Sequence, residues 1–127
     1  MFLQLNHQKL HAYTLSRLLV KECYIVVKRF PPDERFALIQ QIKRASLSVC
    51  LNIAEGASRK SEQERKRFYE IARGSIVEID AAFDLANDLG YCSETDVTNL
   101  SPLMKQTFAI LSKLITMDTG SPNFRNP

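Results

Sequence analysis

The residues best suited to bind a ligand are basic side chains in the middle of the chain. Eight Lys and Arg residues lie between positions 43 and 73, accompanied by four Glu residues. Guanidinium and ammonium groups bind phosphate, and helix N-termini attract it as well. We expect nucleic-acid contacts at Arg44, Arg59, Lys60, Lys66, Arg67 and Arg73. Bases would stack on Tyr69 if its ring were exposed. The competing interpretation is a solvated helix end without a ligand.

A second group of polar residues recurs at helical spacing beside apolar positions. It consists of Gln41, Arg44, Ser48, Asn52 and Glu55, with Glu78 in the equivalent position on the next helix. Polar groups beside a core lower stability unless they are paired. One interpretation is a structural network in which Arg44 pairs with Glu78 or Glu55. The other interpretation is a pocket for a ligand or a protein partner.

No recognisable motif for catalysis or metal binding is present. A di-metal bundle needs Glu-x-x-His pairs, whereas neither His7 nor His11 has Glu three residues before it. The cysteines, Cys23, Cys50 and Cys92, form no CxxC motif, so we interpret them as small apolar residues in a reducing compartment. A Gly-rich phosphate loop and an activated nucleophile are also missing. We expect no enzymatic activity, no cofactor and no metal.

Helices are expected to position these residues, because apolar side chains recur every three or four positions along four segments. The segments cover about residues 9–30, 32–56, 61–89 and 93–117. The third has the most regular core stripe, through Phe68, Ala72, Ser75, Ile79, Ala82, Ala86 and Leu89. Short joints predict an all-α fold, an antiparallel up-down-up-down four-helix bundle that forms one domain, residues 1–117. Residues 118–127 are expected to form a flexible tail.

The ends of these helices have characteristic residues. The pair Pro31-Pro32 ends the first segment, and Ser61-x-x-Glu64 is typical of the start of a helix. Gly56 and Gly90 are expected to follow the last residues of the second and third helices. Pro102 interrupts the fourth segment, where it predicts a kink or a fresh helix start.

The first two helices carry a second apolar stripe away from the core stripe. On the helical wheel it consists of Tyr13, Val20, Tyr24 and Val27, followed by Phe36, Leu47, Leu51 and Ala54. A monomeric bundle needs only one apolar stripe per helix, and exposed apolar patches mark contact surfaces. We therefore expect a homo-oligomer. The competing interpretation is an enlarged core.

Charge is distributed unevenly along the chain. The net charge is +3, which divides into +7 for residues 1–73 and −4 for residues 74–127. Asp84 and Asp88 lie near the end of the third helix, where the helix dipole disfavours carboxylates. We interpret this acidic end as a surface for a basic patch on a neighbouring subunit. No long apolar run or signal peptide is present, so we expect a soluble, cytoplasmic protein.

Several short motifs occur in a specific order and spacing. They are His7-Gln-Lys-Leu10, Gln41-Ile-Lys-Arg-Ala45, Ser48-Val-Cys-Leu-Asn-Ile-Ala-Glu-Gly56, Phe68-Tyr-Glu-Ile-Ala-Arg-Gly-Ser-Ile-Val-Glu78 and Asp88-Leu-Gly-Tyr91. Over about residues 7–117 the chain resembles the four-helix bundle proteins encoded in intervening sequences of bacterial 23S ribosomal RNA genes. It is also distantly similar to the accessory protein of diversity-generating retroelements, a ring that binds nucleic acid and a reverse transcriptase.

The resemblance implies a ring of subunits, a homopentamer. The motif positions of the family fall on Gln41, Arg44, Asn52, Glu55, Gly56, Arg59, Gly74, Ser75 and Glu78. Cys50 stands where the family often has Pro, and Lys43 stands where it often has Arg. The leading hypothesis is a non-enzymatic ring that associates with RNA. The alternative is a protein-interaction scaffold that binds no nucleic acid.

Overall fold

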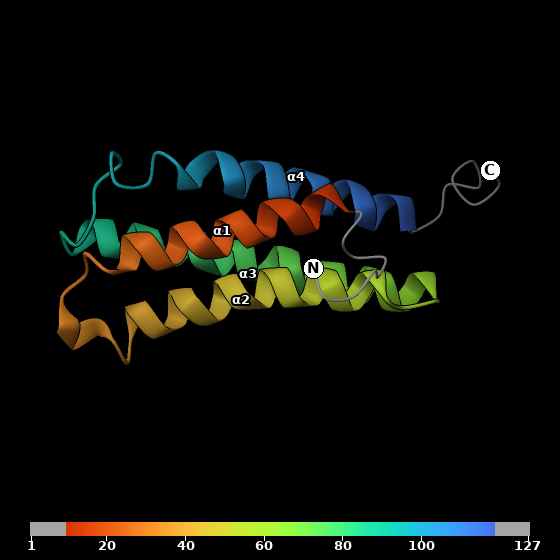
Figure 1. The fold of residues 1–127 in the computed structure, drawn as a ribbon, viewed down its shortest axis with the longest axis horizontal. Helices are drawn as coiled ribbons and strands as arrows, with labels where there is room; N and C mark the ends of the chain where they lie inside the picture. Colours follow the sequence, from red (N-terminus) through yellow and green to blue (C-terminus); the bar gives the residue numbers. More distant parts are fainter. Residues whose placement is uncertain (1–9, 119–127) are drawn as a thin grey trace.

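The computed structural model describes residues 10–118 of the 127-residue chain. Four α-helices run along one another (Figure 1), and a short 3-10 turn precedes the second of them. The elements are α1 (His11–Val27), η2 (Pro32–Glu34), α2 (Leu38–Ala57), α3 (Glu62–Asp88) and α4 (Leu100–Asp118). Within residues 10–118 there is no β-strand. The all-α prediction is confirmed.

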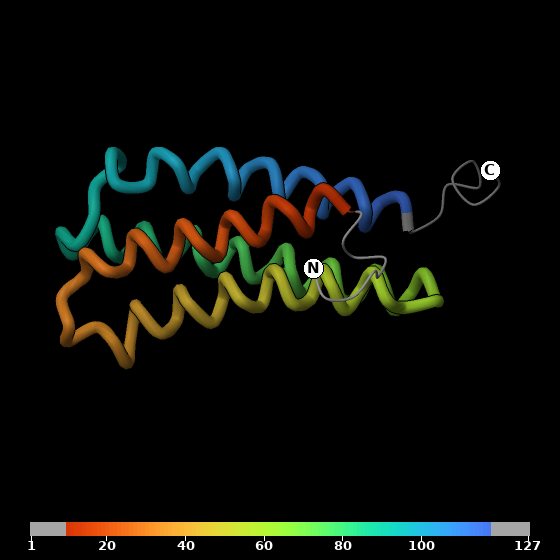
Figure 2. Tube along the Cα trace, viewed as in Figure 1, coloured from red at the N-terminus to blue at the C-terminus, as the bar shows by residue number. Residues whose placement is uncertain are grey.

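Successive helices run in opposite directions, as the tube in Figure 2 shows. The contacts agree, because Ser48 of α2 meets Ser75 of α3, while Gln41, earlier in α2, meets Glu78, later in α3. The helices pack in chain order around the bundle: α1 lies against α2 and α4, and α3 lies against the same two helices. This arrangement is the expected up-down-up-down four-helix bundle.

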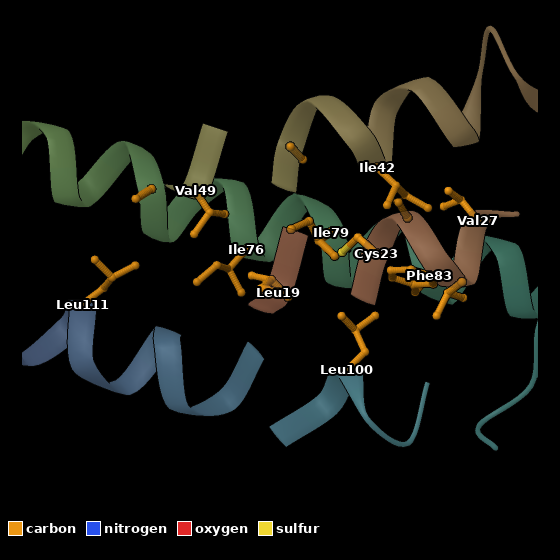
Figure 3. Close-up of a cluster of buried hydrophobic side chains, with 14 of the residues drawn as sticks. Leu19, Cys23, Val27, Ile42, Val49, Ile76, Ile79, Phe83, Leu100 and Leu111 are labelled. Atoms are coloured by element: carbon orange, nitrogen blue, oxygen red, sulfur yellow. The ribbon is translucent and has the colours of Figure 1, made fainter. Parts of the chain in front are cut away.

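The core consists of apolar side chains that all four helices direct inward (Figure 3). Leu19, Ile42, Ile79 and Leu111 are fully buried, one from each helix. Two sequence-based assignments were wrong. Leu89 was expected in the core but is 56% exposed, because α3 ends at Asp88. Val27 was expected on the outer stripe but is 1% exposed, because it packs in the core at the end of α1.

The ends of α3 follow the predicted chemistry. The Ser61 hydroxyl accepts a hydrogen bond from the Glu64 backbone N–H at 3.0 Å. Beyond the other end, Gly90 has φ +78, and the Tyr91 N–H donates to the Ala86 carbonyl at 2.8 Å. The Gly90 N–H donates to the Asn87 carbonyl at 3.0 Å. Together these bonds form a Schellman motif, which satisfies carbonyls that the helix leaves unpaired.

The predicted start of α2 was wrong. Pro32–Glu34 form only a 3-10 turn, and α2 begins six residues later, at Leu38. The non-helical backbone of Ala37, with φ −126 and ψ −105, separates the two elements. Glu34 still contacts the start of α2, because its carboxylate accepts a hydrogen bond from the Leu38 N–H at 3.4 Å. The same carboxylate accepts from the Tyr91 hydroxyl at 2.9 Å.

The expected role of Gly56 was also wrong, because this glycine lies inside α2 and is buried. A Cβ added to Gly56 would lie 2.8 Å from Tyr69 Cε1 and 3.0 Å from Phe68 Cβ. Gly56 therefore allows α2 and α3 to approach closely, and Ser58 caps the helix instead. The expected helix over residues 93–99 was wrong, because this segment forms turns and α4 begins at Leu100. The helix thus starts close to Pro102, which lies in its first turn, where its missing N–H costs no helical hydrogen bond.

Candidate functional site

The joint between α2 and α3, together with the first turns of α3, carries four of the six predicted phosphate contacts, and Arg65 holds it in place. One guanidinium nitrogen of Arg65, Nη1, donates to the carbonyl oxygens of Arg59 at 3.1 Å and Lys60 at 2.7 Å. Arg65 lies in the first turn of α3, whereas the two carbonyls belong to the joint. The side chain therefore ties the joint to the helix and fixes the backbone that carries Arg59 and Lys60.

Arg59 is already partly neutralised at this end of the bundle. Its Nη2 lies 2.7 Å from the Glu55 carboxylate, and its Nη1 lies 3.9 Å from that of Glu64. Its guanidinium also lies 5.0 Å from the centroid of the Phe68 ring. A phosphate that binds Arg59 would have to compete with Glu55, so Arg59 contributes less free positive charge than its type implies.

Three neighbouring cations have no such carboxylate partner. Among the residues that the structure describes, Lys60, Lys66 and Arg67 form no ion pair within 4.0 Å. Lys66 and Arg67 line a shallow hollow on the first turns of α3, together with Ser61, Gln63, Glu64 and Glu70. The N-terminus of α3 adds partial positive charge beside them. These three side chains form the most available basic surface at the α2–α3 end.

The other two predicted contacts lie elsewhere. Arg44 is 15 residues before Arg59, which corresponds to about 20 Å along the helix axis. Arg73 faces α4, where it donates to the Ser112 hydroxyl at 3.2 Å and lies 5.8 Å from the Phe108 ring centroid. The structure thus brings four of the six cations together and separates two. Tyr69 is only 3% exposed, so the condition for stacking bases on its ring is not met.

The polar stripe forms a hydrogen-bonded contact between α2 and α3. The Ser75 hydroxyl donates to the Ser48 hydroxyl at 2.9 Å, and the Asn52 amide donates to the same oxygen at 3.0 Å. The Gln41 amide donates to the Glu78 carboxylate. The predicted pairing of Arg44 with Glu78 or Glu55 was wrong. Glu78 instead accepts a hydrogen bond from Gln41, and Glu55 forms an ion pair with Arg59. These contacts agree with the structural interpretation of the stripe.

Five of the seven predicted interface residues lie outside the fully buried core on α1 and α2. Tyr13, Val20 and Tyr24 are partly buried on α1, while Leu47 and Leu51 on α2 are 39% and 63% exposed. Lys43 Nζ lies 4.9 Å from the centroid of the Tyr24 ring, so the α1 stripe faces α2. Phe36 is exposed but precedes α2, and the Arg35 guanidinium lies 5.0 Å from its ring.

The sequence reasoning missed exposed apolar residues on α3. Ile71, Val77 and Leu85 are 43%, 56% and 54% exposed. Gly74 lies on the same side, and a Cβ added to it would meet no atom within 4 Å. The signal was a second heptad pattern in α3, which the strong core stripe of the same helix hid.

The described residues offer little for catalysis. Burial raises the pKa of the Cys23 thiol to about 12, and burial also raises that of Cys92, so both remain protonated near neutral pH. His11 is exposed on the first residue of α1, and His7 lies outside the described residues. No group of three potential metal ligands occurs within residues 10–118. The described helices also lack an apolar stretch of bilayer length.

The described residues thus define a small all-α, four-helix bundle protein with a basic joint and two exposed apolar surfaces. The family model of the 23S rRNA-intervening sequence protein matches residues 8–113. The chain therefore belongs to this family, as the motifs between His7 and Tyr91 implied. A search of curated proteins found no match to the chain.

Proposed function

We propose that this protein is a non-enzymatic homo-oligomer, a ring of five subunits, that associates with RNA in the cytoplasm. The proposed association with RNA rests on the group of cations at the α2–α3 end of the bundle. Lys60, Lys66 and Arg67 have no carboxylate within ion-pair distance among residues 10–118. The N-terminus of α3 lies beside them, and it favours anions such as phosphate.

The arrangement favours contacts to the phosphate backbone over contacts to bases. Arg65 holds the joint through two backbone carbonyls, so Lys60 projects from a fixed backbone. No exposed aromatic ring in the described part of this joint offers a stacking surface, since Tyr69 is buried and Phe68 lies beneath Arg59. We therefore expect binding that depends strongly on salt and weakly on sequence.

Oligomerisation supports this function because each subunit offers only a few cations. A ring would present the same basic joint once per subunit, and linked weak sites bind one long RNA much more tightly than a single site does. The family is named for intervening sequences of 23S rRNA, and a basic RNA-binding ring is compatible with that name.

The test is fluorescence anisotropy of a labelled single-stranded RNA, titrated at several salt concentrations. We expect log K to fall as log salt rises, by about 0.7 for each phosphate neutralised. The variant Lys60→Gln/Lys66→Gln/Arg67→Gln should bind weakly and lower this slope by about two for each joint in contact with the RNA. A matched control, Lys28→Gln/Arg35→Gln/Lys105→Gln, removes the same charge from exposed positions outside the joint.

Equal loss in the two triple variants would reject the assignment of the joint as the RNA surface. A flat salt response of the wild-type protein, or no binding at low salt, would reject RNA association altogether. That result would favour the alternative, a protein-interaction scaffold that uses the same surfaces without nucleic acid.

A further inference from the structure

Gly74 occupies a position where nothing in the subunit requires glycine. It lies in the middle of the 27-residue helix α3, and it is exposed. Its φ is not positive, since Gly90 is the residue with positive φ within the described part of the chain. Glycine weakens a helix interior relative to alanine. Because a Cβ here would meet no atom within 4 Å, packing inside the subunit does not explain the glycine.

Gly74 belongs to a second heptad stripe on the outer side of α3. We call this stripe the α3 seam, and its residues are Ile71, Gly74, Glu78, Ala81 and Leu85. All five are exposed in the subunit, and Ile71 and Leu85 are 43% and 54% exposed. Apolar residues at such 3-4 spacing form the seam where a second helix packs, and small residues such as Gly74 and Ala81 let two backbones approach closely.

A surface with complementary properties exists on the other side of α2. We call it the α1–α2 face, and its apolar residues are Tyr13, Val20, Tyr24, Leu47 and Leu51. Basic side chains surround it: Arg17, Lys21, Lys43 and Arg44. In contrast, α3 from Gly74 to Asp88 contains four acidic residues and no basic one. The two surfaces are therefore both apolar and of opposite charge, as two halves of one interface would be.

We propose that the α3 seam of one copy of this chain packs against the α1–α2 face of the next copy. The proposal rests on the homo-oligomer proposed above and names the two surfaces that form its interface. Gly74 is the point of closest approach, where a helix of the neighbouring subunit lies over α3. Glu78 and Asp88 lie opposite the basic rim of the α1–α2 face.

The positions of the two surfaces determine the kind of assembly. They lie on neighbouring sides of the bundle and not on opposite sides, because α2 packs between α1 and α3 (Figure 1). A head-to-tail contact through neighbouring sides rotates each subunit relative to the previous one. Such a rotation forms a ring when successive copies close on the first one, and it forms an open helical filament when they do not.

The first test is Gly74→Leu, read by light scattering together with circular dichroism. The leucine has open space in the subunit, so the helical signal should remain that of the wild type. The measured mass should fall from that of the wild-type oligomer to 14.5 kDa, one subunit. The control, Lys113→Leu, places the same side chain on an exposed position of α4 and should leave the mass unchanged.

The second test uses charge reversal to show which surface meets which. Lys21→Glu/Lys43→Glu reverses two of the charges around the α1–α2 face, and Glu78→Lys/Asp88→Lys reverses one charge of the α3 seam and one three residues beyond its last residue, Leu85. Each pair alone should dissociate the oligomer, and the four changes in one chain should restore it, because every contact then regains opposite charges. An interface between two identical surfaces would not recover in this way.

The outcomes separate this inference from the proposed RNA association. A Gly74→Leu variant with the wild-type mass, or a wild-type protein that is a monomer, would overturn the head-to-tail interface. Neither measurement involves RNA, and the basic joint lies outside both surfaces. If the variant of Lys60, Lys66 and Arg67 lost RNA binding but kept the wild-type mass, the proposed interface would not be contradicted.

Discussion

Gly56 of α2 and Tyr69 of α3 lie so close that a single added carbon atom would clash. A Cβ on Gly56 would lie 2.8 Å from Tyr69 Cε1, and Phe68 Cβ would be 3.0 Å away. Tyr69 is 3% exposed in the core, so its ring has little room to move. This contact sets the closest approach of the two helices that carry the basic joint, and it links packing in the core to the geometry of the candidate RNA surface.

We expect Gly56→Ala to destabilise the protein although alanine is the better helix former. Alanine gains about 1 kcal/mol in a helix interior, whereas overpacking a filled site costs about 1–3 kcal/mol. The net loss should be about 1 kcal/mol, measured as a lower urea midpoint. The double variant Gly56→Ala/Tyr69→Leu removes the nearest ring atoms. If steric conflict is the cause, Gly56→Ala should cost less in the Tyr69→Leu background than in the wild type.

Gly74 and Gly90 should respond to alanine in opposite directions. Gly74→Ala should stabilise the dissociated subunit by about 0.5–1 kcal/mol, since the new methyl group enters open space in a helix. Gly90→Ala should destabilise it by about 1–2 kcal/mol, because φ +78 is strained for alanine. Urea unfolding at a concentration where light scattering gives the subunit mass measures both. If both substitutions shifted the urea midpoint in the same direction by a similar amount, the different roles assigned to Gly74 and Gly90 would be wrong.

The stabilising contribution of Asp96 should be lost at acidic pH. The Ser93 backbone N–H donates to the Asp96 carboxylate at 2.9 Å, and this bond, with the nearby Arg29 guanidinium, lowers the pKa of Asp96 from its ordinary value of 3.8. Because the folded state prefers the ionised form, the stabilisation is present above pH 3.8 and is lost as pH falls through the lowered pKa.

The measurement is the urea midpoint of unfolding at a series of pH values between about 6 and about 2, the range in which carboxylates titrate. The wild type should lose stability over the lower part of this range, and Asp96→Asn should show a smaller loss. Glu94→Gln serves as the control, since it removes the same charge from an exposed position that belongs to neither proposed surface. Identical pH profiles for the wild type and Asp96→Asn would count against the role of Asp96.

Local signals in the sequence were sufficient for the fold. The 3-4 spacing of apolar residues located the core stripes, and the ends of α3 followed from Ser61 and Gly90, whose roles depend on a few neighbouring residues. Gly56 was misread because its role depends on Tyr69, which comes from another helix. A glycine that ends a helix and a glycine that allows close packing look alike in a sequence.

The candidate site was predictable only in part, for the same reason. Composition located the cations, but it did not show that Arg73 faces α4 or that Arg65 binds the joint. The pairing of Gln41 with Glu78 spans 37 residues and depends on the register of α2 against α3. The regular spacing of the α3 seam residues was visible in the sequence. Their exposure became evident only once the structure showed which side of α3 faces the core.

Arg65 provides a test that separates positioning of the joint from its charge. Arg65→Lys keeps the positive charge but replaces the planar guanidinium, whose Nη1 donates to two carbonyls, with a more flexible ammonium group. The joint should become more mobile, and RNA affinity should fall by about 1 kcal/mol, or about fivefold. The dependence of log K on log salt should stay the same, because the number of cations is unchanged. Arg35→Lys, the same exchange outside the joint, should leave both affinity and slope unaltered. If Arg65→Lys lowered the slope of log K against log salt as well as the affinity, a phosphate contact would have been lost. Arg65 would then bind phosphate itself, and its role would be binding and not positioning.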